Sequence, residues 1–238
     1  MRIIDLTHMI EEKMPVYPGT LGPSLEVANT HEKDGFKETY LKMYSHTGTH
    51  VDAPAHIIKG AKTLDEFDIS QFIGKAIVIN CKELKEGEAI TMQHLAPYQD
   101  KLSKVDFLLF NLGYDKYWGT DTYYGDFPCI NDEVLDFIIH SKYKGIGFDV
   151  ISLDPMNNLS RHNKLFKVKD ILNIENLKNL DLCGNDIFNF SCFPLKFKDS
   201  DGAPIRAVAW FDWLLKQYKT ITAISLVYGC FILIGFDQ

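Results

Sequence analysis

The stretch HTGTHVDAPAH, residues 46–56, holds three of the eight histidines of the chain together with an aspartate. His50 and Asp52 are two residues apart, so in an extended chain their side chains lie on the same face. Gly48 allows the backbone to turn back between His46 and His50. Imidazole and carboxylate groups suit Zn(II) or a similar divalent ion, and three protein ligands leave a fourth position for water, as in catalytic sites. His46, His50 and Asp52 are therefore predicted to bind a metal ion.

His56 lies four residues beyond Asp52 and follows Pro54, which prevents a helix from running through this stretch. A histidine that lies near a metal-bound water without binding the metal is suited to proton transfer near neutral pH. A single histidine on a strand is more often a hydrogen-bonded structural residue than a ligand. Three histidines and an aspartate at these spacings favour the metal site.

Short runs of β-branched and aromatic residues alternate along the chain with segments that can form helices. Strands are expected at residues 2–6, 39–46, 76–80, 105–111, 145–150, 187–192 and 205–210. Helices are expected at residues 91–102 and 131–141, and another one starting near Glu175. This order predicts an α/β protein with a mixed sheet. An aromatic loop at residues 114–128 either covers a pocket or packs as an ordinary surface loop.

The composition limits the classes of partner and the cellular compartment. The formal charge is −7 and no run of Lys and Arg occurs, so we expect a small-molecule partner and no nucleic acid. The five cysteines are widely spaced and form no CxxC pair, which favours a reducing compartment. Acidic residues interrupt the N-terminal segment where an export signal needs an apolar run. A cytoplasmic protein is expected.

One domain is expected over residues 1–209, followed by an apolar C-terminal extension, residues 210–238, whose role the sequence does not define. Residues 221–236 carry no charge, but they are fewer than the ~18–20 apolar residues that a membrane-spanning helix needs. We therefore expect no membrane span. A buried strand or helix is favoured over a membrane-associated tail.

The histidine-rich stretch resembles a family signature. SHTGTHVDAPAH matches the pattern HxGTHxDxPxH of a cyclase family whose best-known members are bacterial kynurenine formamidases. Four further blocks resemble the family in the same order, and together the five span residues 3–209. They read IIDLTHMIEEKMPVYPG, GFDVISLDP, IENLKNLDLC and FPLKFKDSDGAPIRAVA.

The resemblance implies a swivelling β/β/α-type fold in a single α/β domain, a metal-dependent hydrolase, and a homo-oligomer, either a dimer or a tetramer. It implies Zn(II), one or two ions per subunit, with Mn(II) as the alternative. By position it also implies five metal ligands, a catalytic acid/base and a substrate contact that is Trp in many formamidases. These are His46, His50, Asp52, His162 and Glu175 as ligands, His56 as the acid/base and Tyr17 as the contact.

The residues alone support the distal pair of ligands less than the first cluster. His162 lies in the polar segment SRHNK, which is typical of a loop, and Glu175 is expected at a helix start, where the helix dipole favours a carboxylate. Their separation is one residue longer than in relatives, which favours one ion over two. Asp149 and Asp154 lie near a strand end, and either could orient a ligand histidine. A cap or turn role is favoured for Asp154.

The expected reaction is hydrolysis of an aryl formamide by metal-activated water, with His56 carrying the proton. The resemblance favours N-formyl-L-kynurenine, which gives L-kynurenine and formate in tryptophan catabolism. An isatin-like cyclic amide or a lactone is the nearest alternative substrate. A non-catalytic protein that binds a metal or a small molecule is the alternative of another class. A nucleophilic hydrolase is disfavoured, since no GxSxG motif occurs.

Overall fold

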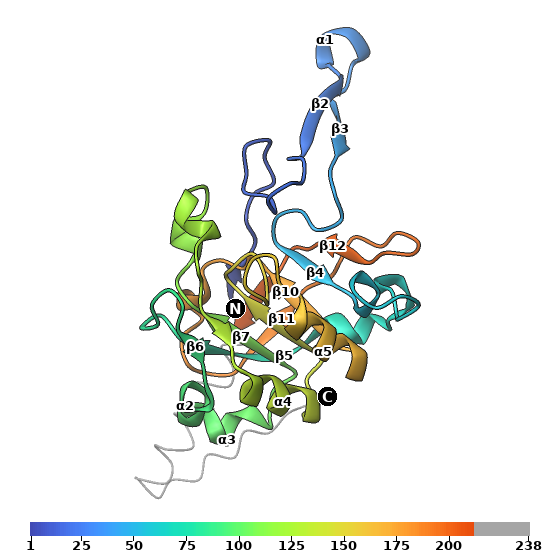
Figure 1. Cartoon of the computed structure of the whole chain (residues 1–238). Coiled ribbons are helices and arrows are strands. Elements are labelled where there is room, and N and C mark those ends of the chain that lie inside the picture. The colour runs from blue at the N-terminus through green and yellow to red at the C-terminus, as the bar shows by residue number, and fades with distance from the viewer. Residues whose placement is uncertain (212–238) are drawn as a thin grey trace, which may run out of the picture.

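A computed structural model describes residues 1–211. At its centre is a nine-stranded mixed sheet (Figure 1). In spatial order its strands are β1 (Arg2–Asp5), β13 (Val208–Phe211), β11 (Phe188–Ser191), β5 (Ile73–Asn80), β7 (Phe107–Asn111), β9 (Gly145–Phe148), β10 (Leu172–Glu175), β4 (His50–Asp52) and β12 (Gly202–Pro204). The predicted α/β domain with a mixed sheet is confirmed. The predicted C-terminal extension lies outside the described residues from residue 212 onward.

The four central strands β5, β7, β9 and β10 run parallel, and the outer strands are antiparallel. The side chains of β5 and β7 alternate between two apolar clusters, one on each face of the sheet. Ile77 and Leu108 belong to the first cluster, whereas Val78 and Leu109 belong to the second. Burial on both faces explains why these strands have continuous apolar sequences, as is usual in parallel sheets.

The helices are short and lie mainly on one side of the sheet (Figure 1). They are α2 (Met92–Leu95), α3 (Gln99–Leu102), α4 (Asp132–His140) and α5 (Ser160–Val168). The predicted helix at residues 91–102 is interrupted by a 3-10 turn at Pro97, because proline lacks the N–H that a continuous helix needs. The predicted helix at 131–141 is confirmed, and the Asn131 side chain caps it by accepting from the Val134 N–H. No helix within residues 1–211 is long and apolar enough to span a membrane.

Several small elements connect these parts. The 3-10 helices are η1 (Pro54–His56), η2 (Leu64–Glu66), η3 (Ile69–Phe72), η4 (Ala96–Tyr98), η5 (Asp115–Tyr117), η6 (Asp121–Tyr124) and η7 (Leu180–Cys183). Strands β6 (Ala89–Ile90) and β8 (Cys129–Ile130) form a parallel pair. Pro54 begins η1, in keeping with the preference of proline for the first helical turn.

Two local predictions at the distal ligands are wrong. Glu175 does not begin a helix, because it is the last residue of strand β10. His162 does not lie in an exposed polar loop, because it lies on α5 and only 3% of it is exposed. Several strand predictions also need new limits, since β3 ends at Lys42, β5 begins at Ile73, β9 ends at Phe148 and β13 begins at Val208.

A hairpin projects away from the sheet and carries a single helical turn at its tip (Figure 1). It consists of β2 (Ser24–Asn29), α1 (His31–Asp34) and β3 (Glu38–Lys42), and we call residues 24–42 the hairpin arm. All five residues of β3 are exposed. After the arm, the chain passes His46, returns to the sheet and enters β4, which carries His50 and Asp52.

Candidate metal centre

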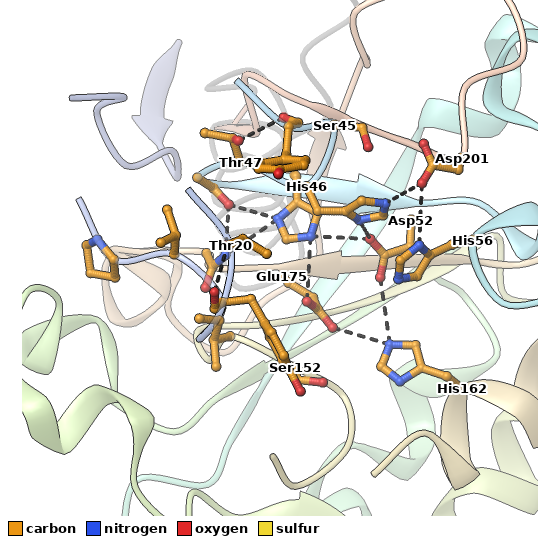
Figure 2. A pocket seen from close by; sticks show the side chains of 18 of the residues that line it. Thr20, Ser45, His46, Thr47, Asp52, His56, Ser152, His162, Glu175 and Asp201 are labelled. Atoms are coloured by element: carbon orange, nitrogen blue, oxygen red, sulfur yellow. Dashed lines mark hydrogen bonds and ion pairs between the residues drawn. The ribbon is translucent and has the colours of Figure 1, made fainter. Parts of the chain in front are cut away.

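The predicted ligands meet where β4 lies between β10 and β12 (Figure 2). Both pairings are antiparallel, and the register places His50 opposite Glu175 and Asp52 opposite Asn173. His50, Asp52 and Glu175 are all at most 5% exposed. Neighbouring strands therefore bring together ligands that are far apart in the sequence.

His46, His50 and Asp52 form a group that we call the proximal group. Asp52 Oδ1 lies 2.7 Å from His46 Nδ1 and 3.3 Å from His50 Nε2. The other nitrogen of His50, Nδ1, lies 2.8 Å from the Gly48 carbonyl oxygen, which leaves Nε2 for the site. Gly48 has a φ of +67°, a conformation that favours glycine, so it provides the predicted turn between the histidines.

Asp52, His162 and Glu175 form a second group, the distal group. His162 Nε2 lies 3.7 Å from Asp52 Oδ2 and 3.4 Å from Glu175 Oε1. Asp154 accepts from the backbone N–H of His162 at 3.0 Å and faces its Nδ1 at 2.8 Å. Asp154 therefore both caps α5 and orients the histidine, although the sequence favoured only the cap or turn role.

All five predicted ligands converge, and the two groups share Asp52. Glu175 also faces both groups, since its Oε2 lies 3.6 Å from His50 Nε2. Within each group the possible ligand atoms lie within 4.8 Å of one another. Imidazole nitrogens and carboxylate oxygens at such separations fit a divalent metal ion.

The charges of the site also favour a bound cation. Burial opposes protonation of His46, but the carboxylates of Asp52 and Asp201 outweigh it and raise the pKa of His46 to about 10. Burial likewise opposes protonation of His162, whose pKa is nevertheless raised well above its ordinary value by Asp154, Asp52 and Glu175. The clustered carboxylates therefore attract positive charge. A metal ion would compete with protons for these imidazoles, because a histidine ligand must be neutral.

His56 lies beside the proximal group at the end of η1. Its ring centroid is 3.9 Å from that of His46, and its Nδ1 lies 3.5 Å from Asp201 Oδ2. Its side chain is 33% exposed, whereas that of His50 is 5% exposed. Burial lowers the pKa of His56 below its ordinary value despite the nearby Asp52 carboxylate, which favours the neutral form of the ring. A neutral, accessible imidazole beside a metal group can accept a proton.

Three site residues were missed or given another role by the sequence prediction: Asn173, Asp154 and Asp201. Asp201 Oδ2 lies 2.9 Å from His46 Nε2, the nitrogen that faces away from Asp52. Its neighbour Gly202 is required there, because a Cβ atom at this position would collide with the His46 ring. Asn173 precedes Glu175 by two residues on the same strand, a spacing that places both side chains on one face.

A cavity of about 570 Å³ opens above the two groups (Figure 2). Its walls include the apolar side chains of Val16, Leu21, Ile151 and Leu159. Tyr17 also lines it, is 36% exposed, and accepts from the Asn157 N–H at 3.2 Å. The predicted substrate contact thus lies in the cavity above the predicted ligands. An apolar wall above a polar base is the usual form of a small-molecule site.

The aromatic loop at residues 114–128 supports this site from outside the cavity, whose lining residues come from other segments. Tyr124 Oη accepts from the Val16 N–H at 3.2 Å. Tyr123 is fully buried and donates to Asn176 Oδ1 at 2.7 Å. Asn176 in turn donates to the Gly48 carbonyl that also faces His50. The loop therefore packs as a support for the turn at Gly48.

Known proteins are similar to this chain in both sequence and fold. Residues 4–155 match the model of the family described as "Putative cyclase". The chain is 30% identical to a kynurenine formamidase of Bacillus cereus, over 86% of this chain and 95% of that protein. It is 33% identical to an uncharacterized protein of Methanocaldococcus jannaschii, over 88% of this chain and 99% of that protein. The solved structure of isatin hydrolase A from Labrenzia aggregata, 23% identical, has the same fold with a TM-score of 0.76, over 87% and 93% of the two chains. The chain therefore belongs to the putative cyclase family.

Proposed function

We propose that this protein is a metal-dependent hydrolase of amide bonds and that its substrate is an aryl formamide such as N-formyl-L-kynurenine. The observation that carries the proposal is the convergence of His46, His50, Asp52, His162 and Glu175 at the base of an apolar cavity, with His56 beside them. The kynurenine formamidases among the relatives support the hydrolase class and suggest the substrate.

When bound, a divalent ion supplies Lewis acidity, which polarises a carbonyl group and makes a water molecule a stronger acid. Zn(II) suits the imidazole and carboxylate donors, and Mn(II) is the alternative. We place the enzyme in the cytoplasm. The four cysteines in the described part of the chain are free and buried, as is usual in a reducing compartment.

Residues of the chain carry out proton transfer and substrate binding. His56 accepts the proton of the attacking water and returns it to the leaving amine. Its Nδ1 faces Asp201, so Nε2 is the nitrogen that exchanges the proton. Tyr17 and the apolar wall at Leu21 and Ile151 hold the aryl ring and exclude water from it. The formyl carbon is then placed between His56 and the metal ligands.

A substrate screen tests the proposal. Protein reconstituted with Zn(II) or Mn(II) is offered N-formyl-L-kynurenine, isatin and an aryl lactone, and product is followed by absorbance. We expect the formamide to be hydrolysed fastest. Preference for isatin or the lactone would keep the hydrolase class but change the substrate. Tight metal binding without turnover of any of the three would favour a binding protein.

Replacing His56 tests its role separately from metal binding. We expect His56→Ala to lower kcat about 10²–10⁴-fold, the usual contribution of a general acid/base, with unchanged metal content. His140→Ala is the matched control, because His140 is exposed on α4, outside the site. Elemental analysis and initial rates measure the two quantities. Unchanged turnover in the His56 variant would remove it from the mechanism.

A further inference from the structure

Asn173 lies at the centre of the distal group. It is fully buried on β10, next to strand β4 that carries Asp52. Its Nδ2 donates to Asp52 Oδ2 at 2.9 Å and to Glu175 Oε1 at 2.8 Å. The same nitrogen lies 3.3 Å from His162 Nε2. One amide nitrogen therefore contacts the three atoms that a cation in the distal group would need.

The two ends of this amide have very different surroundings. Nδ2 faces two carboxylate oxygens, which accept both of its N–H bonds. Oδ1 is buried and has no hydrogen-bond partner among the described residues. An unpaired buried acceptor is costly. The amide keeps this orientation because the strong, charge-assisted hydrogen bonds form at its nitrogen.

The proximal group is arranged differently. Asp52 directs Oδ1 toward His46 and His50 and Oδ2 toward Asn173, so the amide contacts one side of the shared carboxylate. Two carboxylate oxygens of the distal group would attract a cation, Asp52 Oδ2 and Glu175 Oε1. Both already accept an N–H bond from Asn173. In the proximal group Asp52 Oδ1 instead faces the imidazole of His46, which can lose its proton and become a ligand, whereas the amide of Asn173 cannot.

We propose that Asn173 sets the metal stoichiometry of this site at one ion. Its amide takes the place of a second cation in the distal group, so a single divalent ion binds at the proximal group. A second ion must break two hydrogen bonds to carboxylates. Each is worth about tenfold or more, so the second ion binds on the order of 100-fold more weakly than it would without the amide. This inference rests on the metal centre of the proposed function.

The test is a metal titration that does not depend on activity. Zn(II) is added to metal-free protein, and bound metal is measured by calorimetry and by elemental analysis after equilibrium dialysis. We expect one tight ion per wild-type chain. Asn173→Ala removes the competing donor, and Asn173→Asp replaces it with an oxygen ligand, so both variants should bind two ions tightly. Circular dichroism checks that each variant folds, and either variant alone suffices for the comparison.

A double variant locates the second ion. Adding His162→Ala to Asn173→Ala removes a distal ligand and should return the stoichiometry to one. Two tight ions in the wild type, or one ion in folded Asn173 variants, would overturn the inference. Those results leave the proposed hydrolase intact, which the substrate screen tests. Absence of any tight ion in the wild type would instead contradict the proposed metal centre.

Discussion

Asp201 holds His46 through the nitrogen that the proximal group does not use. His46 Nδ1 faces Asp52, and its Nε2 lies 2.9 Å from Asp201 Oδ2. A carboxylate on the outer nitrogen fixes the orientation of a ligand imidazole and makes its inner nitrogen a better donor. Asp201 also lies 3.5 Å from His56. One carboxylate thus positions both a candidate ligand and the candidate proton carrier.

We expect Asp201→Asn to weaken metal binding about tenfold, because loss of such an outer contact typically costs 10–100-fold in affinity and Asn retains an acceptor. Competition with a chromophoric chelator measures the affinity. Asp199→Asn is the matched control, because Asp199 is exposed two residues away. Equal affinities for the two variants would show that Asp201 does not position His46.

At the scale of elements, the sequence predicts the strands with apolar side chains on both faces but misses β10, which carries buried polar residues. The apolar strands β5 and β7 were predicted close to their observed limits, because burial on both faces gives long apolar runs. In β10, Leu172 and Ile174 alternate with Asn173 and Glu175. Those polar residues are buried because they form the site, so the local pattern conflicts with the usual rule that polar side chains are exposed.

Helix α5 was missed for a related reason. Its buried residues, His162, Leu165 and Phe166, follow the i, i+3, i+4 spacing of a helix. This spacing can be recognised in the sequence only if His162 is treated as a buried residue. The polar residues around His162 instead suggested a loop. The first cluster was predictable because His46, His50 and Asp52 are close in sequence. His162 and Glu175 were predicted only through the family resemblance, because the geometry of the distal group depends on strand register and on this helix.

The hairpin arm projects from the sheet and leaves apolar side chains exposed to solvent. Val27, Phe36, Tyr40 and Leu41 are between 51% and 64% exposed. An isolated two-stranded hairpin is marginally stable in water, and exposed apolar clusters commonly mark protein interfaces. We expect a second copy of this chain to cover the arm, in agreement with the homo-oligomer implied by the family resemblance.

Substitution in the arm tests this expectation. Tyr40→Ser combined with Leu41→Ser should lower the mass measured by sedimentation to that of one chain, because it removes apolar contact area from the proposed interface. Glu38→Ser is the control, since it changes an exposed polar residue of the same strand. A monomeric wild-type protein, or a double variant with the wild-type mass, would contradict the expectation.

For the whole molecule, the proposed ion should act as a stabiliser. Its ligands His46, His50 and Asp52 converge because Gly48 turns the chain and β4 is held in the sheet, so the unfolded chain does not hold them in this arrangement. Free ion at 100 times its Kd stabilises a protein by about 2.7 kcal/mol. For a chain of this size that corresponds to a Tm increase of about 5–10 °C.

Thermal unfolding of chelator-treated protein, with and without Zn(II), measures this increase. His50→Ala removes a proximal ligand and should abolish most of it. An equal increase in wild type and variant would mean that the ion stabilises the protein from another site.

The pairing of β4 with β10 and β12 also has a consequence for how the chain folds. Asp52 and Asn173 are 121 positions apart, and His46 and Asp201 are 155 positions apart. Contacts between such distant segments form late, because a long loop must close before they are gained. During synthesis on the ribosome, the segment around His46 emerges well before Asn173 and Asp201. It therefore exists for a time without these partners. Full affinity for the ion is therefore expected only after synthesis has passed Asp201 and β4 has paired with β10 and β12.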